Sequence, residues 1–306
     1  MNASGRSARE APVTSLADHD ETLAEARARN VRDALAEDIG RCDWTGLLVP
    51  EHQRVQARVV VREAAVLCGR EWFDAVVHAL DATAHLHWQV AEGAWMRPDA
   101  QVVRIEGQAR ALLAAERPAL NFIQLLSATA TLTRRHVDAV AGASPLPQGC
   151  AILDTRKTIP GLRQAQKYAV RVGGGVNQRL ALWDGILIKE NHIAAAGGIA
   201  AVLANARALD AGVAIQIEVE TIAQLHEALE HGATSVLLDH FDLAHMREAV
   251  AVNRAHGRPA LLEASGNVEL AQLRDIAASG VDRISIGRLT KDVMAVDFSL
   301  RVLGPA

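Results

Sequence analysis

The chain of 306 residues lacks long apolar runs and paired cysteines, and we expect no secretory leader. No apolar run approaches the roughly 20 residues of a membrane-spanning helix, so we expect no membrane partner. The polar N-terminus has no apolar signal-peptide core, and we expect residues 1–20 to form a flexible tail. The cysteines, Cys42, Cys68 and Cys150, are widely spaced and form no metal-binding motif. So sparse a set fits a reducing cytoplasm, the location we expect.

Positive charge is not in excess overall, but it is concentrated in one stretch. The chain carries 36 acidic and 32 basic residues, so it lacks the strongly basic domain of a nucleic-acid binder, and we expect no nucleic-acid partner. Between Thr155 and Lys189 only Asp184 is acidic. The same stretch holds seven basic residues: Arg156, Lys157, Arg163, Lys167, Arg171, Arg179 and Lys189. This local excess predicts a site for an anionic small molecule.

The first part of the chain predicts a small mixed domain. Over residues 21–130, strand-like alternation is mixed with helical spacing in no regular order, which is typical of an α+β domain. A long helix is expected to open at Glu116, with Pro118 in its first turn, where a backbone N–H would be unpaired anyway. We expect this helix to end near Gly142 and the domain boundary to lie near it.

After Gly149 short apolar runs alternate with helical segments, which predicts parallel βαβ units. The expected strands are Ala151–Leu153, Ile186–Ile188, Ala214–Val219, Ser235–Leu238, Ala260–Leu262 and Arg283–Ile286. They are fewer than the eight strands of a closed barrel. We therefore predict an incomplete TIM-like α/β barrel over residues 131–290, or further strands that the pattern misses. Residues 291–306 are expected to form a C-terminal segment that packs back on the N-terminal domain.

Polar residues follow each expected strand. Because the active sites of parallel α/β barrels lie at the carboxyl ends of the strands, we expect these residues to share one site. In chain order they are Thr155, Arg156, Lys157, Lys189, Glu218, Glu220, Asp239, Glu263, Ser265, Gly266, Asn267 and Gly287. Ser285, Ile286 and Gly287 at the end of the last strand offer a backbone site for phosphate. Arginine offers a planar fork that matches carboxylate and phosphate, and lysine offers a compact charge. The plainer alternative is a set of surface charges in salt bridges.

The acidic residues permit more than one interpretation. Glu218 and Asp239 end consecutive strands, where they would hold Mg²⁺ or bond the hydroxyls of a sugar. A transition-metal site that also includes Glu220 and His240 ranks lower. Lys189 would alternatively serve as the Schiff-base nucleophile of an aldolase.

Two loops are also ambiguous. Three consecutive glycines at residues 173–175 fit either a helix end or a backbone that approaches a ligand closely. The segment from Ser265 to Asn267 precedes a helix, where it would cradle a phosphate or act as an ordinary N-cap.

Seven motifs, taken in order, carry a family resemblance. They are Asp154-Thr-Arg-Lys-Thr-x-Pro-Gly-x-Arg163, Lys167-Tyr-Ala-Val170, Gly173-Gly-Gly-x-Asn-x-Arg179, Leu187-Ile-Lys-x-Asn-His192, Glu218-Val-Glu-Thr221, Leu237-Leu-Asp-His-Phe241 and Glu263-Ala-Ser-Gly-Asn267. The chain resembles the quinolinate phosphoribosyltransferases from about Glu37 to Thr290. The resemblance implies an α+β domain, an incomplete barrel and a homodimer or dimer-based oligomer. It also implies that quinolinate and phosphoribosyl pyrophosphate react with Mg²⁺ present, giving nicotinate mononucleotide, pyrophosphate and carbon dioxide for NAD biosynthesis.

The resemblance further implies roles for individual residues. The substrate-binding set would be Arg117, Thr155, Arg156, Lys157, Gln178, Arg179, Lys189, Glu218, Asp239, Ser265, Gly266, Asn267, Ser285, Ile286, Gly287 and Lys291. Arg117 would cross the dimer interface to complete the partner's site. Lys157, Lys189, Glu218 and Asp239 would be catalytic. Glu218 and Asp239 would also bind the metal, partly through the substrate.

One departure from the family bears on the acceptor. Arg156, Arg179 and Lys157 would hold the carboxylates of quinolinate. The family usually has histidine at position 178, where this chain has Gln178, which keeps hydrogen bonding but has no cationic form. This residue keeps open a molybdenum-transport-associated paralogue with a different acceptor. A non-catalytic sensor of phosphorylated metabolites is a second alternative, although a sensor needs no carboxylates beside a developing positive charge.

Overall fold

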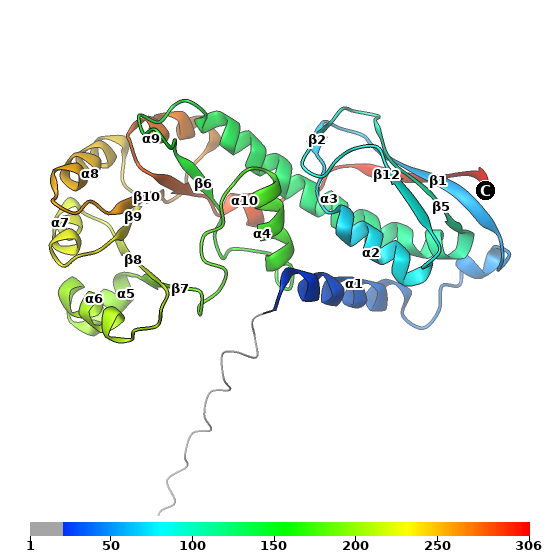
Figure 1. Cartoon of the computed structure of the whole chain (residues 1–306), viewed down its shortest axis with the longest axis horizontal. Helices are drawn as coiled ribbons and strands as arrows, with labels where there is room; N and C mark the ends of the chain where they lie inside the picture. Colours follow the sequence, from blue (N-terminus) through cyan, green and yellow to red (C-terminus); the bar gives the residue numbers. More distant parts are fainter. Residues whose placement is uncertain (1–20) are drawn as a thin grey trace, which may run out of the picture.

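The computed structural model describes residues 21–306, and Figure 1 shows two units joined by one long helix, α3 (Ala109–Val140). The expected tail, residues 1–20, lies outside the described residues. The unit at the right of Figure 1 is an α+β domain, and the unit at the left is built on a parallel sheet, as predicted. Over residues 21–306, no helix combines the length and the apolar character that crossing a membrane requires.

The N-terminal domain is built on a four-stranded antiparallel sheet with strand order β12-β1-β5-β3. These strands are β1 (Arg54–Val61), β3 (His85–Trp88), β5 (Gln101–Gln108) and β12 (Phe298–Pro305). The other elements are α1 (Leu23–Ile39), a 3-10 turn (Gly46–Leu48), α2 (Arg70–Leu80) and the paired strands β2 (Ala65–Val66) and β4 (Trp95–Met96). Alternation on β1 buries Val55, Ala57 and Val59, which share a core with Trp72 of α2 and Leu120 of α3.

The C-terminal segment lies on this sheet. β12 pairs with β1 from Phe298 opposite Val61 to Pro305 opposite Val55. The strand is the red arrow beside β1 in Figure 1, on the side of the molecule away from the barrel helices. The sheet is thus made from both ends of the described chain.

α3 begins earlier than predicted. It starts at Ala109 and not at Glu116, so Pro118 lies inside the helix and not in its first turn. Pro118 removes one backbone hydrogen bond from the helix. Burial explains why the helix continues, because Leu112 and Ala115 extend its buried face before the proline. The apolar contacts on both sides of Pro118 outweigh the missing bond.

α3 also connects the two cores. Leu112 and Leu120 belong to the N-terminal core, whereas Val140 at the other end belongs to the barrel core. The predicted division between residues 130 and 131 therefore falls inside one continuous helix and not in a linker. A helix that is buried in both cores sets the position of the N-terminal domain against the barrel.

The second domain has six parallel strands in the order β6-β11-β10-β9-β8-β7. They are β6 (Ala151–Leu153), β7 (Gly185–Ile188), β8 (Ala214–Val219), β9 (Ser235–Asp239), β10 (Leu261–Ser265) and β11 (Arg283–Ser285). Because β6 and β7 are the two edges of the sheet, the barrel is not closed, and the predicted incomplete barrel is confirmed.

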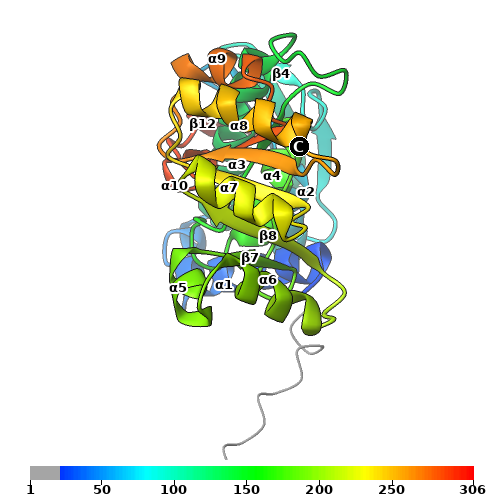
Figure 2. The same cartoon turned by 90° about the vertical axis from the view of Figure 1, so that its left-hand side faces the viewer.

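Between residues 163 and 291, seven helices alternate with or follow these strands in the chain. They are α4 (Arg163–Val172), α5 (Glu190–Ala196), α6 (Ile199–Ala208), α7 (Ile222–Glu230), α8 (Leu243–Ala255), α9 (Leu273–Ala278), which follows a 3-10 turn (Leu270–Gln272), and α10 (Arg288–Lys291). Ala165 and Ala169 of α4 pack in the N-terminal core. Figure 2 shows α6, α7 and α8 stacked side by side in front of the strands. Strands buried on both faces read as continuous apolar runs, which is why their positions were predictable.

The glycine run at residues 173–175 serves packing. α4 ends at Gly173, where a Cβ atom would lie 2.5 Å from the backbone oxygen of Ala130 and 2.7 Å from Cβ of Thr133. A Cβ on Gly175 would lie 2.8 Å from Cγ2 of Thr133. Since Gly173 has an ordinary φ of −71°, close approach to α3, and not backbone conformation, requires glycine there. Of the two interpretations, the helix end is the one that the structure supports.

We predict that Gly173→Ala lowers the free energy of unfolding by about 1–3 kcal/mol, the usual cost of overpacking a rigid contact. Gly257→Ala is the matched control, because a Cβ atom on Gly257 meets nothing within 4 Å. Urea unfolding of both variants measures the difference. Equal stability of the two variants would contradict the packing role.

Candidate active site

The side chains that follow the parallel strands line two adjoining cavities, of about 350 and 240 Å³. We call the larger the arginine cavity; its lining is Thr155, Arg156, Lys157, Gln178, Arg179, Leu187, Lys189, Glu218, Leu237, Glu263, Ser265 and Ser285. We call the smaller the loop cavity; its lining is Thr155, Lys157, Lys189, Glu218, Asp239, His240, Ser265, Gly266, Asn267, Val268, Ser285, Ile286, Gly287, Arg288 and Lys291. Both cavities share Lys157, Lys189 and Glu218, so ligands bound in them would lie next to each other.

The structure brings all but one of the predicted substrate-binding residues to these cavities. The exception is Arg117, which is exposed on α3 in the N-terminal domain and lines neither cavity. Lys291, on the short helix α10, reaches the loop cavity. Within one chain, Arg117 therefore lies apart from the other predicted substrate-binding residues.

The arginine cavity concentrates positive charge. Burial lowers the pKa of the Arg179 guanidinium, and the nearby charge of Arg156 lowers it further. The Nε atom of Arg156 is buried and has no hydrogen-bond partner among the described residues. A buried, unpaired donor beside a second guanidinium fits an anionic group that accepts hydrogen bonds from both.

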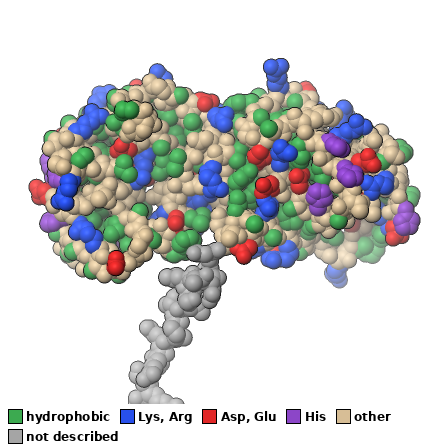
Figure 3. All heavy atoms as spheres, viewed as in Figure 1, with side chains coloured by type: hydrophobic (Ala, Val, Ile, Leu, Met, Phe, Trp, Pro, Cys, Tyr) green, Lys and Arg blue, Asp and Glu red, His purple; other side chains and the backbone are tan. Residues whose placement is uncertain are grey.

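This charge is local to the cavity. On the face drawn in Figure 3, acidic and basic side chains are interspersed in both halves of the molecule, with no large patch of one sign. That face is unlike the continuous basic surface of a nucleic-acid binder.

The carboxylates lie where the two cavities meet. Lys189 Nζ lies 3.3 Å from an oxygen of Glu218, whose side chain is 10% exposed. Burial raises the pKa of the Glu218 carboxyl; Lys189 opposes this shift and the charge of Asp239 adds to it. Asp239 in turn lies 2.8 Å from Nδ1 of His240. Two neighbouring carboxylates therefore face a space lined by lysines.

The acidic residues fit one of the two predicted metal sites. Over residues 21–306, no group of three or more His, Cys, Asp or Glu side chains is arranged to hold a metal ion. The transition-metal site of Glu218, Glu220, Asp239 and His240 is therefore wrong: Glu220 is exposed and lines neither cavity. Glu218 and Asp239 alone suit Mg²⁺, which usually takes one or two protein carboxylates and completes its shell with water and phosphate oxygens.

In two loops, glycines expose the main chain to the loop cavity. Gly266 and Asn267 have φ values of +100° and +45°, and a Cβ atom on Gly266 would lie 2.9 Å from the backbone nitrogen of His240. A Cβ atom on Gly287 would lie 3.0 Å from Cδ of Lys157. The alternative role of an ordinary N-cap is wrong, because Glu269 occupies the cap of the following helical turn. Glycine at these positions leaves room for a phosphate against the backbone.

Three of the seven clustered basic residues line neither the arginine cavity nor the loop cavity. Lys167 forms a buried ion pair with Asp154, in which the two side chains are 1% and 0% exposed. Arg163 donates to Oγ1 of Thr158 at 3.1 Å, and Arg171 donates to Oδ1 of Asn177 at 2.6 Å. Their role is to hold loops, which the charge count by itself did not distinguish from ligand binding.

The Asp154–Lys167 pair is the largest feature that the sequence did not predict. Asp154 also accepts hydrogen bonds from Nδ2 of Asn177 and from the backbone N–H of Gln178 at 2.9 Å. Burial raises the pKa of the Asp154 carboxyl and lowers that of the Lys167 ammonium, while their mutual attraction opposes both shifts. The pair connects the loop of Arg156 to the loop of Arg179.

Of two buried polar residues at the site, Gln216 was not predicted, and Glu263 was predicted only as one of the polar residues at the end of its strand. Gln216 and Glu263 are 6% and 0% exposed, and Gln216 connects Gln178 to Glu263 by hydrogen bonds. Gln216 lies two residues before Glu218 on β8, and Glu263 lies two residues before Ser265 on β10. Because alternate residues of a strand share a face, this spacing was a usable signal.

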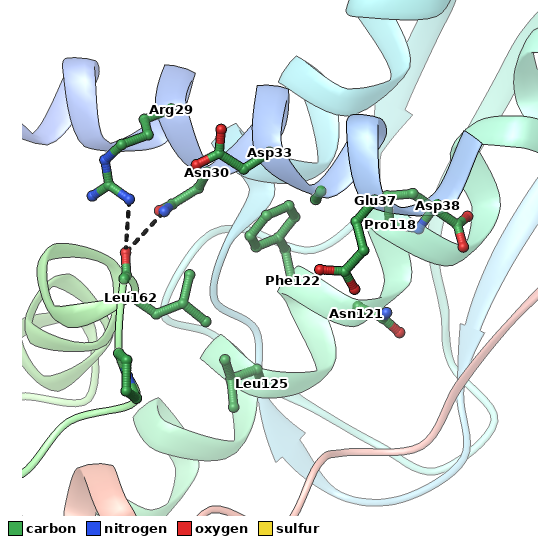
Figure 4. A pocket seen from close by; sticks show the side chains of 13 residues that line it. Arg29, Asn30, Asp33, Glu37, Asp38, Pro118, Asn121, Phe122, Leu125 and Leu162 are labelled. Atoms are coloured by element: carbon green, nitrogen blue, oxygen red, sulfur yellow. Dashed lines mark hydrogen bonds between the residues drawn. The ribbon is translucent and has the colours of Figure 1, made fainter. Parts of the chain in front are cut away.

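A further cavity, of about 360 Å³, lies between α1, α3 and the loop that follows Lys157 (Figure 4). Asp33, Glu37 and Asp38 of α1 line it, so it is poorly suited to an anion. In the same region Arg29 and Asn30 donate to the carbonyl oxygen of Gly161 at 3.2 and 3.0 Å. The N-terminal helix thereby holds the loop of the arginine cavity in place.

We predict opposite changes in the pKa of Glu218 for two substitutions. Asp239→Asn removes a negative neighbour and should lower that pKa, whereas Lys189→Met removes a positive neighbour and should raise it. Carboxyl ¹³C titration of the full chain measures both directions. Because the pKa of Glu218 is raised in the native chain, acidification should protonate it at a higher pH than an ordinary glutamate. Shifts of the same sign in both variants would contradict this account of the site.

Family models match most of the chain. The model of the quinolinate phosphoribosyl transferase C-terminal domain matches residues 129–301, and that of the N-terminal domain matches residues 43–127. Nicotinate-nucleotide pyrophosphorylase [carboxylating] of Mycobacterium leprae is 37% identical over 283 residues, which cover 90% of this chain and 97% of that protein. A probable enzyme of the same name from Bacillus subtilis is 37% identical over 267 residues, covering 87% and 90%.

Solved structures agree with these matches. The nicotinate-nucleotide pyrophosphorylase of Francisella tularensis has a TM-score of 0.85 and 40% identity, covering 91% of this chain and 96% of that one. The enzyme of the same name from Ehrlichia chaffeensis has a TM-score of 0.83 and 34% identity, covering 90% and 98%. The resemblance inferred from the motifs is confirmed.

Proposed function

Because the chain belongs to the quinolinate phosphoribosyltransferase family, we propose that its two cavities bind quinolinate and phosphoribosyl pyrophosphate side by side. The enzyme transfers the phosphoribosyl group to quinolinate with loss of carbon dioxide, giving nicotinate mononucleotide and pyrophosphate in NAD biosynthesis. We assign the two substrates to these cavities because Lys157, Lys189 and Glu218 line both of them. Two anions that must react with each other need such a junction.

Quinolinate fits the arginine cavity. It is a dianion, and Arg156, Arg179 and Lys157 offer the positive charge that two carboxylates require. The unpaired Nε of Arg156 gives one of those carboxylates a buried donor. In this arrangement the pyridine nitrogen faces the loop cavity, where the backbone of Gly266 and Gly287 accommodates phosphate.

The carboxylates at the junction suit the transfer step. The nitrogen–carbon bond forms as the bond from the ribose carbon to pyrophosphate breaks, and positive charge develops on the ribose. Glu218 and Asp239 stabilise that charge, and Lys189 and Lys291 stabilise the departing anion. Decarboxylation then leaves an electron pair on the ring, which the positively charged pyridinium stabilises until the carbon takes a proton. Positioning and electrostatics carry both steps.

Glu218 and Asp239 would hold Mg²⁺ together with oxygens of phosphoribosyl pyrophosphate, and the ion would supply positive charge to the pyrophosphate group. Lys189 forms an ion pair with Glu218, which stabilises the charged form of its amine. The Schiff-base lysine of an aldolase reacts as the neutral amine, so this contact argues against the aldolase alternative. The paralogue and the sensor gain no support from the matched relatives. The cytoplasm is the location proposed, on the ground of the sparse cysteines.

We predict turnover of quinolinate with phosphoribosyl pyrophosphate and Mg²⁺, followed as nicotinate mononucleotide by chromatography with nicotinate as a parallel substrate. Arg156→Met should lower kcat/KM for quinolinate by about 10- to 100-fold, the effect of losing a charged hydrogen bond. The matched control is Arg247→Met, on the exposed side of α8. A well-folded native chain without product, or product from nicotinate in place of quinolinate, would overturn the proposed function.

We propose a homodimer in which Arg117 of each subunit completes the site of its partner. The support is its position: an exposed arginine outside both cavities of its own chain. Random mixing of the inactive Arg117→Ala and Lys189→Ala proteins makes about half of the dimers hybrids. In each hybrid one of the two sites has both residues intact, so the mixture should recover about a quarter of native activity. No recovery despite demonstrated subunit exchange would place the role of Arg117 within its own subunit.

A further inference from the structure

A chain of polar side chains runs from the arginine cavity into the barrel interior. Gln178 donates from Nε2 to Oε1 of Gln216 at 3.0 Å, and Gln216 donates from Nε2 to Oε2 of Glu263 at 2.9 Å. Gln216 and Glu263 are buried, at 6% and 0% exposure. The guanidinium of Arg283 lies 2.9 Å from the same oxygen of Glu263. We call Gln178, Gln216 and Glu263 the amide relay.

The hydrogen bonds of the amide relay all run in one direction, with each glutamine donating toward Glu263. Glu263 is ion-paired with Arg283, and a carboxylate in an ion pair accepts hydrogen bonds, so Gln216 turns its NH₂ group toward Glu263. The carbonyl oxygen of Gln216 then faces Gln178 and needs a donor. Arg283 supplies the counter-charge of the buried carboxylate. Glu263 therefore determines the orientation of an amide two hydrogen bonds away.

This orientation matters for an anionic ligand. A glutamine amide presents either a carbonyl oxygen or an N–H, and only the N–H attracts a carboxylate. One of the two amide hydrogens of Gln178 is used by Gln216. No second acceptor for this NH₂ group occurs among the described residues, and Gln178 lines the arginine cavity, so the other hydrogen is available to a ligand there. If the amide were reversed, two carbonyl oxygens would face each other in the relay. The buried carboxylate excludes that arrangement.

We infer that Glu263 and Gln216 are positioning residues that hold Gln178 as a hydrogen-bond donor to a carboxylate of the pyridine acceptor. The inference rests on the proposed function, because quinolinate is the ligand it concerns. Gln178 contacts the acceptor, and Gln216 acts through Gln178; Glu263, which also lines the arginine cavity, acts on Gln178 through Gln216. The relay makes the cavity selective for a carboxylate at the position that the remaining N–H of Gln178 faces.

A double-mutant cycle tests this inference on the full chain. Gln216→Met removes the middle of the relay and keeps the Glu263–Arg283 pair. The dissociation constant for quinolinate, measured by calorimetry, should rise about tenfold. In a Gln178→Ala background the same substitution should change it by less than about twofold, since no amide is left to orient. An equal rise in both backgrounds would overturn the inference.

The matched control acts on the far side of the relay. Ser235 accepts a hydrogen bond from Arg283 at 2.6 Å, and Ser235→Ala loosens the arginine without touching either glutamine. Its dissociation constant for quinolinate should stay within about twofold of the native value. A tenfold rise in this control would mean that general loosening of the barrel interior, and not the relay, weakens binding.

A second measurement needs no substrate. The side-chain NH₂ signals of Gln178 in ¹⁵N–¹H spectra, assigned by their loss in Gln178→Ala, should shift in both Gln216→Met and Glu263→Gln. Unchanged signals in both variants would overturn the relay. Failure of the proposed function has a different signature, because the native chain would then bind no quinolinate while the amide signals still report on the relay.

Discussion

The buried ion pair of Lys167 and Asp154 is the contact on which the geometry of the site depends. Asp154 directly precedes the segment that carries Arg156, and its carboxylate also accepts the backbone N–H of Gln178, next to Arg179. Removing one member of a buried pair typically costs about 3–5 kcal/mol, because the other charge is left uncompensated. The pair therefore fixes two cationic loops against each other, and α4 supplies the lysine that does so.

This arrangement places like charges close together before any ligand arrives. Burial and the neighbouring charge of Arg156 lower the pKa values of both Arg163 and Arg179, a sign that the cations are held near each other against repulsion. Glu218 is engaged with Lys189 and not with the arginines. An anion bound in the arginine cavity would relieve that repulsion, so part of its affinity would come from a site organised in advance.

The sequence predicted the ends of the barrel strands to within one residue, because strands buried on both faces are apolar runs that end at polar residues. The exception is β10, which continues three residues beyond the predicted end at Leu262. It also placed the cavity-lining residues, since chain order and strand direction bring strand ends together. It failed where tertiary burial decides the outcome. The start of α3 depends on the burial of Ala109 and Leu112. Lys167 was counted among the seven basic residues of the stretch that predicted an anion site, because charge alone does not reveal which way a side chain faces. The direction of the hydrogen bonds around Gln216 required coordinates.

The pairing of β12 with β1 has a consequence for the order of events during synthesis. β1 is made from residues 54–61, but one of its two neighbours comes from residues 298–305, after the entire barrel. Until then β1 has an unpaired edge, the kind of surface that invites pairing with another chain. The whole barrel sequence must therefore be translated before the N-terminal sheet can add its last strand. During that time the incomplete sheet must avoid misassembly. In this chain the first domain to emerge is the last to be completed.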